Sequence, residues 1–396
     1  MIIYFFSHDC NTSFIINELH FLLQSNKVEQ LNIITDYPIN DKEISDHPKC
    51  KVCRIYGSRK SLSPGFLLPV FVEFLKHPVW YSKRNKWKET FFTSKNQLQK
   101  ATELIRLGIA ENAILYTYWA DSSAYLLACF KKLGLKNLAV TRMHAFDIYE
   151  YGDNNGYIPW RLFVYKKLDK LLPISVHGAE YVNHKYPFTL NKTQTIPLGI
   201  PLSDESVNLS PVSAKQIISC SWVGNRKNLT GVFDALQNMQ NTTWTHLGDG
   251  EEFETLKTHT NRPANLKVKL PGKVSQEEIR TYYRDEYITC FISLSTNEGL
   301  PVSMMEAMAF GIPVVSTDVG GCAEIVTPET GVLLPKNYTN EDVVNAVKTC
   351  AEKFASPEAR KRIQDFIRTN FDAEKNYQKF IDFLEDENKK HIALYS

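Results

Sequence analysis

Short apolar runs alternate along the chain with longer stretches in which apolar residues recur every three or four positions. Short runs are typical of buried strands and the longer stretches of amphipathic helices, so their alternation predicts α/β layers with parallel sheets. The predicted strands of the first half are Ile2–Phe6, Leu31–Thr35, Ala113–Tyr118, Leu138–Arg142, Lys170–Pro173 and Thr193–Pro197. Helices are predicted between them, for example over Ser122–Leu133 and His177–Tyr186.

The second half repeats this pattern more regularly. Strands are predicted at Gln216–Val223, Thr243–Leu247, Leu266–Leu270, Ile288–Leu294, Pro313–Thr317 and Gly331–Leu334. Helices are predicted at Leu229–Met239, Glu251–His259, Ser275–Tyr283 and Val302–Phe310. A last helix over Asp372–Asn388 is indicated by the spacing of Tyr377, Phe380, Ile381 and Leu384.

Two segments interrupt the alternation and suggest how the chain is divided. Asn40–Ser63 is polar and without periodicity, which predicts a long loop. Pro197–Pro201, followed by the polar run Leu202–Ser213, is typical of a linker. We therefore expect two doubly wound α/β domains of similar size, which suits a chain of 396 residues. The expected ranges are residues 1–201 for the first domain, 202–370 for the second and 371–396 for a C-terminal helix.

Composition narrows the class of protein. Hydrophobic residues make up 43% and charged residues 23%, which is ordinary for a globular protein and excludes a disordered one. A net charge of +2 provides no global field for nonspecific binding of nucleic acid, so no nucleic-acid partner is expected. The longest apolar stretch, Phe66–Val72, is far shorter than the roughly 20 residues that span a bilayer. The first residues lack the basic segment of a signal peptide, and eight cysteines are too few for a disulfide scaffold, so we expect a cytoplasmic location.

One cysteine pair leaves two interpretations open. Two residues separate Cys50 from Cys53, and His47 lies just before the pair. A structural zinc site needs four ligands, commonly from two such pairs, and the chain has no second pair. Two thiols on a surface loop are the favoured interpretation, and a metal or redox site is the alternative.

Open parallel sheets bind ligands at the carboxyl ends of their strands, so the residues that follow each predicted strand are the first candidates for ligand binding. With two domains, the expected site is the cleft between them. The most informative segment is Phe291–Pro313, where a strand, a loop and a helix follow one another. Glu298 falls in the loop and Glu306 in the second turn of the helix, while Pro301 suits the first helical position.

The start of that helix is expected to bind an anion. Backbone N–H groups at its positive end, from Gly299, Leu300 and Val302, would face the ligand. Two carboxylates beside an anion site suit a ligand with both hydroxyl and phosphate groups, as in a nucleotide-sugar. The alternative is an ordinary surface loop followed by a helix with one solvated glutamate.

Other strand ends offer weaker candidates in the second half. Arg226 and Lys227 follow the first strand of that half, where a cation could neutralise a diphosphate; a solvated turn is the alternative. Gly320 and Gly321 permit a backbone to approach a ligand closely. His246–Gly250 is a strand-to-helix turn, and the absence of a full G-x-G-x-x-G motif weighs against a dinucleotide-binding dehydrogenase.

Two loops of the first half also follow predicted strands and are expected to face the cleft. His144 lies in Thr141–Asp147, after a predicted strand, where it could bond a sugar hydroxyl or assist proton transfer; a structural histidine is the alternative. The loop Ser7–Thr12, after the first strand, carries Asp9 and Asn11 and has no glycine-rich phosphate pattern.

Together these motifs resemble glycosyltransferase family 4, whose members have the GT-B fold and retain the configuration of the transferred sugar. The resemblance rests on the E-x7-E pair Glu298 and Glu306 within Ser295–Val315, with further matches at Val319–Val326, His246–Gly250, Leu270–Val274 and Arg142–Asp147. It covers essentially the whole second domain and, more loosely, the first. The implied fold is GT-B, with two doubly wound Rossmann-like domains facing across a cleft and a final helix that returns to the first domain.

The resemblance also implies roles for individual residues. Glu298 matches the glutamate that contacts the transferred sugar, and Glu306 the one that holds the ribose. Lys227 matches the diphosphate-binding lysine, and His144 the histidine near the reacting sugar, which makes Glu298 and His144 the catalytic candidates. Asp9 and Asn11 are expected on the acceptor side. The backbone around Gly272 and Val274 would line the base pocket. The family often has Gly-Arg where this chain has Ser221-Trp222, and Arg226 is the candidate to supply the missing cation.

The implied activity is the retaining transfer of a hexose-type sugar from a nucleoside diphosphate-sugar to a glycan or polyprenyl-linked acceptor, in the biosynthesis of bacterial capsule, O-antigen or exopolysaccharide. No Asp-x-Asp triplet is present, so no metal and no cofactor are expected. The alternatives are an inactive subunit of the same fold that binds a partner or glycan, and a phosphorylase or sugar-nucleotide epimerase.

A membrane surface is a further expected partner. Lys76, Lys83, Arg84, Lys86 and Lys88 lie in a stretch without acidic residues, interleaved with Trp80, Tyr81 and Trp87 and preceded by the apolar Phe66–Phe74. Basic and aromatic residues together suit an anionic bilayer, where a lipid-linked acceptor would be found. A solvated basic turn beside a core helix is the alternative.

Overall fold

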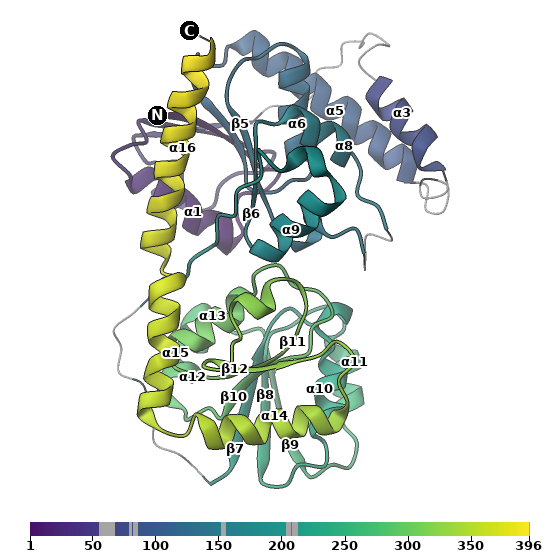
Figure 1. Cartoon of the computed structure of the whole chain (residues 1–396), viewed down its shortest axis with the longest axis vertical. Coiled ribbons are helices and arrows are strands. Elements are labelled where there is room, and N and C mark those ends of the chain that lie inside the picture. The colour runs from purple at the N-terminus through teal and green to yellow at the C-terminus, as the bar shows by residue number, and fades with distance from the viewer. Residues whose placement is uncertain are drawn as a thin grey trace. The chain divides into compact units, whose positions relative to one another are not determined.

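The computed structural model describes residues 1–54, 68–78, 81, 86–151, 156–202, 207 and 213–395. The chain forms two compact units (Figure 1). Unit 1 consists of Met1–Pro197 and Glu374–Ser396, and unit 2 of Leu198–Ala373. The division after Pro197 lies four residues before the boundary expected from the sequence, and the chain returns to unit 1 for its last residues.

Unit 1 contains a six-stranded parallel sheet with the order β3-β2-β1-β4-β5-β6. Its strands are β1 (Ile2–Phe6), β2 (Gln30–Ile34), β3 (Cys50–Cys53), β4 (Ile114–Thr117), β5 (Ala139–Met143) and β6 (Lys170–Pro173). Its helices are α1 (Ser13–Gln24), α2 (Lys42–Ser45), α3 (Leu68–Lys76), α5 (Lys86–Leu107), α6 (Ser122–Lys132), α7 (Ala145–Ile148), α8 (Arg161–Lys167), α9 (Val176–Lys185), η3 (Pro187–Thr189) and α16 (Ala373–Tyr395).

Two sequence-based expectations for unit 1 were wrong. Part of the expected loop Asn40–Ser63 forms α2 and the edge strand β3, because Leu31–Ile34 of β2 pairs with Cys50–Cys53; residues 55–63 lie outside the described part. Cys50 and Cys53 therefore lie on a strand and not on a loop, half-buried, with free thiols. Thr193–Pro197 forms no strand: Thr193 makes only an isolated bridge to Leu171.

Unit 2 has the second parallel sheet, with the order β12-β11-β10-β7-β8-β9. Its strands are β7 (Lys215–Cys220), β8 (Thr242–Leu247), β9 (Leu266–Gly272), β10 (Cys290–Ser293), β11 (Val314–Thr317) and β12 (Gly331–Leu334). Its helices are η4 (Asn225–Lys227), α10 (Leu229–Leu236), α11 (Phe253–Thr260), α12 (Gln276–Asp285), α13 (Val302–Ala309), η5 (Gly320–Glu324), α14 (Asn340–Lys353) and α15 (Pro357–Asn370).

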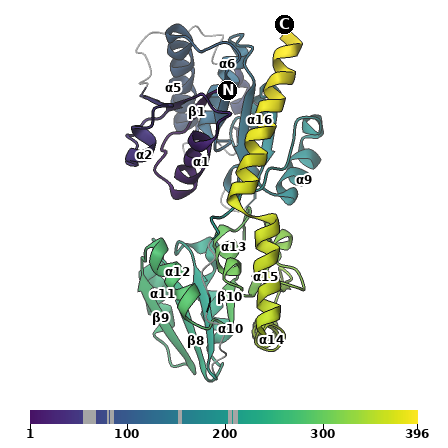
Figure 2. The ribbon, with the colours of Figure 1, turned by 90° about the vertical axis from the view of Figure 1, so that its left-hand side faces the viewer.

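Both sheets have the strand order of a doubly wound Rossmann-like domain. Counted within each unit, the order is 3-2-1-4-5-6, with the direction of winding reversed between the first and fourth strands. The reversal lies between β1 and β4 in unit 1 and between β7 and β10 in unit 2. Helices flank the strands of each sheet (Figure 2). Ligands of such sheets bind at the carboxyl ends of the strands that flank the reversal.

The last helix is part of the core of unit 1. Phe380 and Leu384 of α16 are fully buried, and the Phe380 ring lies 4.4 Å from the guanidinium carbon of Arg142, on β5. That buried guanidinium also pairs with Glu18 of α1, Nε to Oε2 at 3.2 Å. Lys27 forms ion pairs with Asp382 and Glu385 at the surface of the same helix.

The segment expected to contact a membrane is only partly described. Trp80, Lys83 and Arg84 lie outside the described residues, and Tyr81, expected at the surface, is buried against Phe74 and Tyr157. Among the described helices, none has an apolar stretch long enough to cross a bilayer.

Candidate functional site

The loops that follow β7 and β10 meet at the reversal point of unit 2. Lys227 ends the short helix η4 after β7, and Glu298 lies in the loop after β10. Their side chains form an ion pair, Nζ to Oε1 at 2.6 Å, with Lys227 29% exposed and Glu298 12% exposed. The backbone N–H of Thr296 donates to the carbonyl oxygen of Arg226 at 2.8 Å, which ties the two loops together. The structure therefore brings two of the predicted donor-binding side chains into contact.

The loop after β11 braces the Glu298 loop. Gly320 has φ +55°, and a Cβ atom there would lie 1.7 Å from the carbonyl oxygen of Glu298. Gly321 donates its N–H to the carbonyl oxygen of Gly299 at 2.8 Å. Only glycine permits this approach, since any side chain would displace the neighbouring backbone. These glycines were predicted to approach a ligand; the backbone that they approach is that of the Glu298 loop.

The helix after the Glu298 loop, α13 (Val302–Ala309), begins at Val302, as the sequence predicted. Pro301 is the N-cap of α13, one position earlier than expected, and Val302 is the first helical residue. Gly299 and Leu300 are buried just before it. The positive end of α13 therefore lies beside Glu298 and Lys227, at the carboxyl edge of the sheet.

Glu306 lies on α13 in a different environment from Glu298. Burial raises the pKa of its carboxyl group to about 7, against the attraction of Arg280. Burial, and next the nearby carboxyl group of Glu306, raises the pKa of the Cys220 thiol to about 12. Because Cys220 is the last residue of β7, Glu306 faces the edge where Lys227 lies.

Glycines also join the loops after β7 and β8. A Cβ atom at Gly248 would lie 1.9 Å from the carbonyl oxygen of Ser221, and one at Gly250 would lie 2.4 Å from that of Val223. This packing accounts for the glycines of His246–Gly250. His246 itself is buried and bonded to Ser219, Nδ1 to Oγ at 2.9 Å.

Trp222 stands on this edge where the resemblance expects arginine. Its side chain is 65% exposed. Its indole lies against two glycines: a Cβ atom at Gly250 would be 2.9 Å from the ring, and one at Gly224 would be 3.4 Å away. Arg226, the proposed substitute cation, is exposed on η4.

The predicted base-pocket residues lie at the end of β9. Gly272 has φ +82° and accepts a hydrogen bond from Gly248 N–H at 2.9 Å. Val274 is half-buried, just before α12. Gly272 is thereby joined to the loop that packs on Ser221 and Val223, so the predicted donor-binding residues of unit 2 all lie at the carboxyl ends of β7, β8, β9 and β10.

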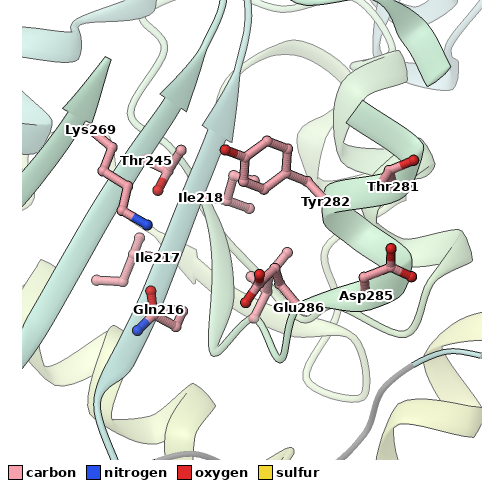
Figure 3. Close-up of a pocket in the computed structure, with 10 residues that line it drawn as sticks. Gln216, Ile217, Ile218, Thr245, Lys269, Thr281, Tyr282, Asp285 and Glu286 are labelled. Atoms are coloured by element: carbon pink, nitrogen blue, oxygen red, sulfur yellow. The ribbon is translucent and has the colours of Figure 1, made fainter. Parts of the chain in front are cut away.

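A separate pocket of about 240 Å³ lies on unit 2 away from these loops. It is lined by the early part of β7, including Gln216 and Ile218, and by the last turns of α12, including Tyr282 and Asp285 (Figure 3). Because α12 starts near the carboxyl edge and runs toward the amino ends of the strands, this pocket is not part of the candidate site.

In unit 1, His144 follows β5 and is the N-cap of α7. Its backbone N–H donates to Asp147 Oδ1 at 2.6 Å, and Ala120 N–H donates to Asp147 Oδ2 at 2.8 Å. Burial, with repulsion from Arg142, lowers the pKa of the His144 imidazole to about 3. The ring is therefore neutral at physiological pH and can act through hydrogen bonds or as a weak base.

Asp9 and Asn11 hold the loop after β1 in place. Asp9 Oδ1 accepts from the backbone N–H and the side-chain amide of Asn11, at 2.9 and 2.7 Å. That amide also donates to the carbonyl oxygen of Pro38, in the loop after β2, at 2.9 Å. Their neighbour His8 was not singled out by the sequence: its partner Asp36 is 28 residues away, and no local spacing connects the two.

No group of three or more His, Cys, Asp or Glu side chains with the geometry of a metal site occurs among the described residues. The expectation of a site without metal stays a prediction.

Comparison with known proteins agrees with this architecture. The sequence profile of the family Glycosyl transferases group 1 matches residues 203–370. A relative named as a colanic acid biosynthesis glycosyltransferase, WcaL of Escherichia coli (strain K12), is 27% identical over 53% of this chain and 55% of its own length. The match thus spans about half the length of this relative.

Two solved structures share the fold over nearly the whole chain. Sucrose-phosphate synthase from Thermosynechococcus elongatus has a TM-score of 0.69 and 17% identity, with 98% of each chain covered. HepE from Anabaena, solved in complex with UDP-glucose, has a TM-score of 0.64 and 15% identity, with 98% of this chain and 100% of that chain covered. These likenesses confirm the predicted α/β fold with two Rossmann-like domains, the GT-B class. Residues 203–370 of the chain are a glycosyltransferase group 1 domain.

Proposed function

We propose that the protein transfers a sugar from a nucleoside diphosphate-sugar to a glycan or lipid-linked glycan acceptor in the biosynthesis of a bacterial surface polysaccharide. The observation that carries the proposal is the Lys227–Glu298 pair at the reversal point of unit 2, beside the start of α13. A cation and a helix N-terminus suit a diphosphate, and a carboxylate beside them suits sugar hydroxyls. The family matched by residues 203–370 and the UDP-glucose bound by HepE support this assignment.

In the proposed reaction the bond between the anomeric carbon and the diphosphate oxygen breaks, and a bond to the acceptor oxygen forms on the same face. The acceptor hydroxyl gives its proton to the departing phosphate oxygen. Lys227 and the N-terminus of α13 stabilise the charge that develops on the diphosphate, with Arg226 as a second candidate cation, while Glu298 holds the transferred sugar. These groups supply the electrostatic stabilisation without a metal ion.

The test is transfer from a panel of nucleotide-sugars, each first screened for thermal stabilisation of the protein. We expect one donor to raise the melting temperature and to be hydrolysed slowly without acceptor. Transfer should continue in EDTA, and NMR of the product should show the anomeric configuration of the donor. An inverted product would contradict the retaining assignment, and a donor that binds without hydrolysis or transfer would favour an inactive glycan-binding subunit.

Glu298→Gln separates binding from catalysis. If Glu298 contacts the sugar as the bond breaks, this change should lower kcat by on the order of 10²-fold with little change in donor affinity. Glu306→Ala should mainly raise the donor KM if Glu306 holds the ribose. A Glu298→Gln enzyme with normal kcat would leave His144 as the next candidate catalytic residue.

We also propose an anionic membrane surface as a partner. Phe71 and Leu75 of α3 are 59% and 66% exposed, and Trp87 and Phe92 of α5 are 45% and 63% exposed. The exposed Lys76 and Lys88 lie on the same two helices. Such apolar and basic side chains suit the interface of a bilayer that carries a lipid-linked acceptor.

A further inference from the structure

Three side chains stand at one level on the carboxyl edge of unit 1. The register pairs Phe6 of β1 with Ile34 of β2 and with Thr117 of β4. His8, Asp36 and Trp119 each follow these residues by two positions, so they leave three adjacent strands side by side. The winding of the sheet reverses between β1 and β4, which is where open parallel sheets bind ligands.

The polar members of this edge form a chain that starts in the interior. Lys100 of α5, with 9% of its side chain exposed, pairs with Asp36, Nζ to Oδ1 at 2.5 Å. The other oxygen of Asp36 lies 2.6 Å from Nδ1 of His8, whose side chain is 59% exposed. A carboxylate at Nδ1 favours the tautomer with its proton on that atom, which leaves the lone pair on Nε2. The imidazole is thus oriented from the inside to accept a hydrogen bond from a hydroxyl group.

Aromatic rings continue the edge on both sides of His8. The Tyr37 ring, on a residue that is 51% exposed, lies 5.1 Å from the His8 ring. Beyond β4, the rings of Trp119 and Phe146 lie 5.9 Å apart, and Phe146 is 43% exposed. We call Tyr37, His8, Trp119 and Phe146 the aromatic edge. Its members follow β2, β1, β4 and β5, and four strands spaced about 4.8 Å apart make a row of roughly 15 Å.

We propose that the aromatic edge binds the acceptor, and that the acceptor is a glycan of at least two sugars. This inference rests on the proposed function and names its acceptor class. The C–H faces of pyranose rings stack on Trp119 and Phe146, because aromatic faces are negative and apolar. A sugar hydroxyl donates to Nε2 of His8. The row is longer than one sugar ring, and the carboxylates of Asp9 and Asp36 disfavour a diphosphate at this place.

The test measures glycan binding by the full chain on an array of mono- to tetrasaccharides from bacterial surface polysaccharides, followed by calorimetric titration of the glycan that binds best. Wild type should bind a glycan of two or more sugars and bind its constituent monosaccharides at least tenfold more weakly. Trp119→Ala combined with Phe146→Ala should weaken binding tenfold or more. Phe146→Ala alone, at an exposed position, should lower affinity severalfold without a change in melting temperature.

The matched control is Phe188→Ala. Phe188 is 44% exposed in η3, which follows α9 toward the amino end of β6 and so lies at the other edge of the sheet. Its glycan affinity should stay within twofold of wild type. Asp36→Asn tests the orientation of His8: it should weaken glycan binding severalfold while donor affinity is unchanged.

In the binding experiment, the proposal is overturned if wild type binds no glycan on the array, or if wild type and the Trp119/Phe146 double variant bind equally well. The proposed function fails independently of it. If wild type binds glycan through Trp119 but neither binds nor hydrolyses a nucleotide-sugar, the aromatic edge stands and the transferase assignment is wrong. If donor hydrolysis is normal and the double variant transfers with an unchanged acceptor KM, the transferase stands and the aromatic edge is not its acceptor site.

Discussion

Lys227 and Glu298 satisfy each other in the structure, at 2.6 Å, although each is assigned to a different part of the donor. With their side chains 29% and 12% exposed, the two groups are only partly screened by solvent, so opening the pair requires that each group finds a new partner. In the proposed complex a diphosphate oxygen replaces the carboxylate at the ammonium, and a sugar hydroxyl replaces the ammonium at the carboxylate. The sequence could predict both residues from their positions after strands, but not the contact, because 71 residues separate them and only the pairing of β7 with β10 brings them together.

Lys227→Ala should weaken binding of the nucleoside diphosphate by about tenfold to a hundredfold. A hydrogen bond to a charged group contributes about 1.5–3 kcal/mol, and about 1.4 kcal/mol corresponds to tenfold in affinity. Calorimetry on the diphosphate alone provides the measurement. Lys257→Ala is the matched control, because Lys257 forms a similar pair with Glu254 on α11, at 2.9 Å, away from the strand edge. Equal diphosphate affinity in the wild type and the Lys227 variant would remove Lys227 from the site.

Glu306 should make the stability of the folded chain depend on pH, and the sign of this dependence follows from the burial of its carboxyl group. Burial raises its pKa from 4.5 to about 7 in the folded chain, so between these values the folded state holds a proton that the unfolded state has lost. Its contribution therefore lowers stability as pH rises from 4.5 to 7 and is fully unfavourable above pH 7. Glu306→Gln removes this cost, so the variant should gain a few degrees in melting temperature over wild type at pH 8 and little or nothing at pH 5. A difference that is constant with pH would show that Glu306 does not titrate in this range.

At the scale of elements, the predicted strands agree with the structure where the apolar run is itself buried. Ile2–Phe6 and Gly331–Leu334 were predicted to the residue, because each apolar run ends at a polar or turn residue, Ser7 in the first case and Pro335 in the second. Cys50–Cys53 was missed because an edge strand needs little burial: Lys51 and Val52 are exposed, and the pairing partner is decided by β2. Thr193–Pro197 was overpredicted because its backbone follows β6 through only a few hydrogen bonds.

The end of the last helix, α16, also could not be predicted from local sequence. Its apolar spacing predicted Asp372–Asn388, and the helix continues to Tyr395. The extension is held by contacts to distant residues, including His391 Nε2 at 2.6 Å from the carbonyl oxygen of Lys136. No periodicity within the helix carries that information.

Phe380→Ala tests whether α16 is part of the core of unit 1. Phe380 is fully buried, against Arg142 and Tyr116. Removing a buried phenyl ring should lower the free energy of unfolding by about 3–5 kcal/mol. Urea denaturation provides the measurement, with Lys389→Ala as control, because the exposed pair of Lys389 with Glu385 should contribute less than about 1 kcal/mol. A loss of similar size in the two variants would show that the helix is only loosely attached.

At the scale of the whole molecule, one strand order occurs twice, and each reversal point carries different chemistry. In unit 2 the edge presents a cation, a helix start and two carboxylates; in unit 1 it presents aromatic rings and an oriented imidazole. The sequence predicted the repeated fold because it needs only the alternation of apolar periods. The resemblance supplied most of the residues proposed to bind the donor, but the aromatic edge is composed of side chains from loops over 100 residues apart and has no local motif.

The exposed apolar side chains of α3 and α5 belong to this scale, because their role depends on where the whole chain resides. Vesicles with anionic phosphatidylglycerol should bring wild type to the top of a flotation gradient at low salt, and vesicles of phosphatidylcholine should do so much less. Basic residues supply about 1 kcal/mol each near an anionic surface, and this attraction falls within a Debye length that shrinks from about 10 Å at 0.1 M salt to 3 Å at 1 M. Binding should therefore weaken as salt rises.

Leu75→Ser separates membrane insertion from general attraction. Leu75 is 66% exposed on α3, and Leu190, also 66% exposed, lies just after η3, outside the two helices. Losing one exposed leucine from a bilayer contact should lower partitioning by on the order of tenfold, because a buried leucine contributes about 1.5–3 kcal/mol of transfer free energy. Leu190→Ser should partition as wild type does. If wild type fails to float with anionic vesicles at low salt, or if the two serine variants float equally well, then α3 does not contact the membrane and its exposed apolar side chains require another explanation.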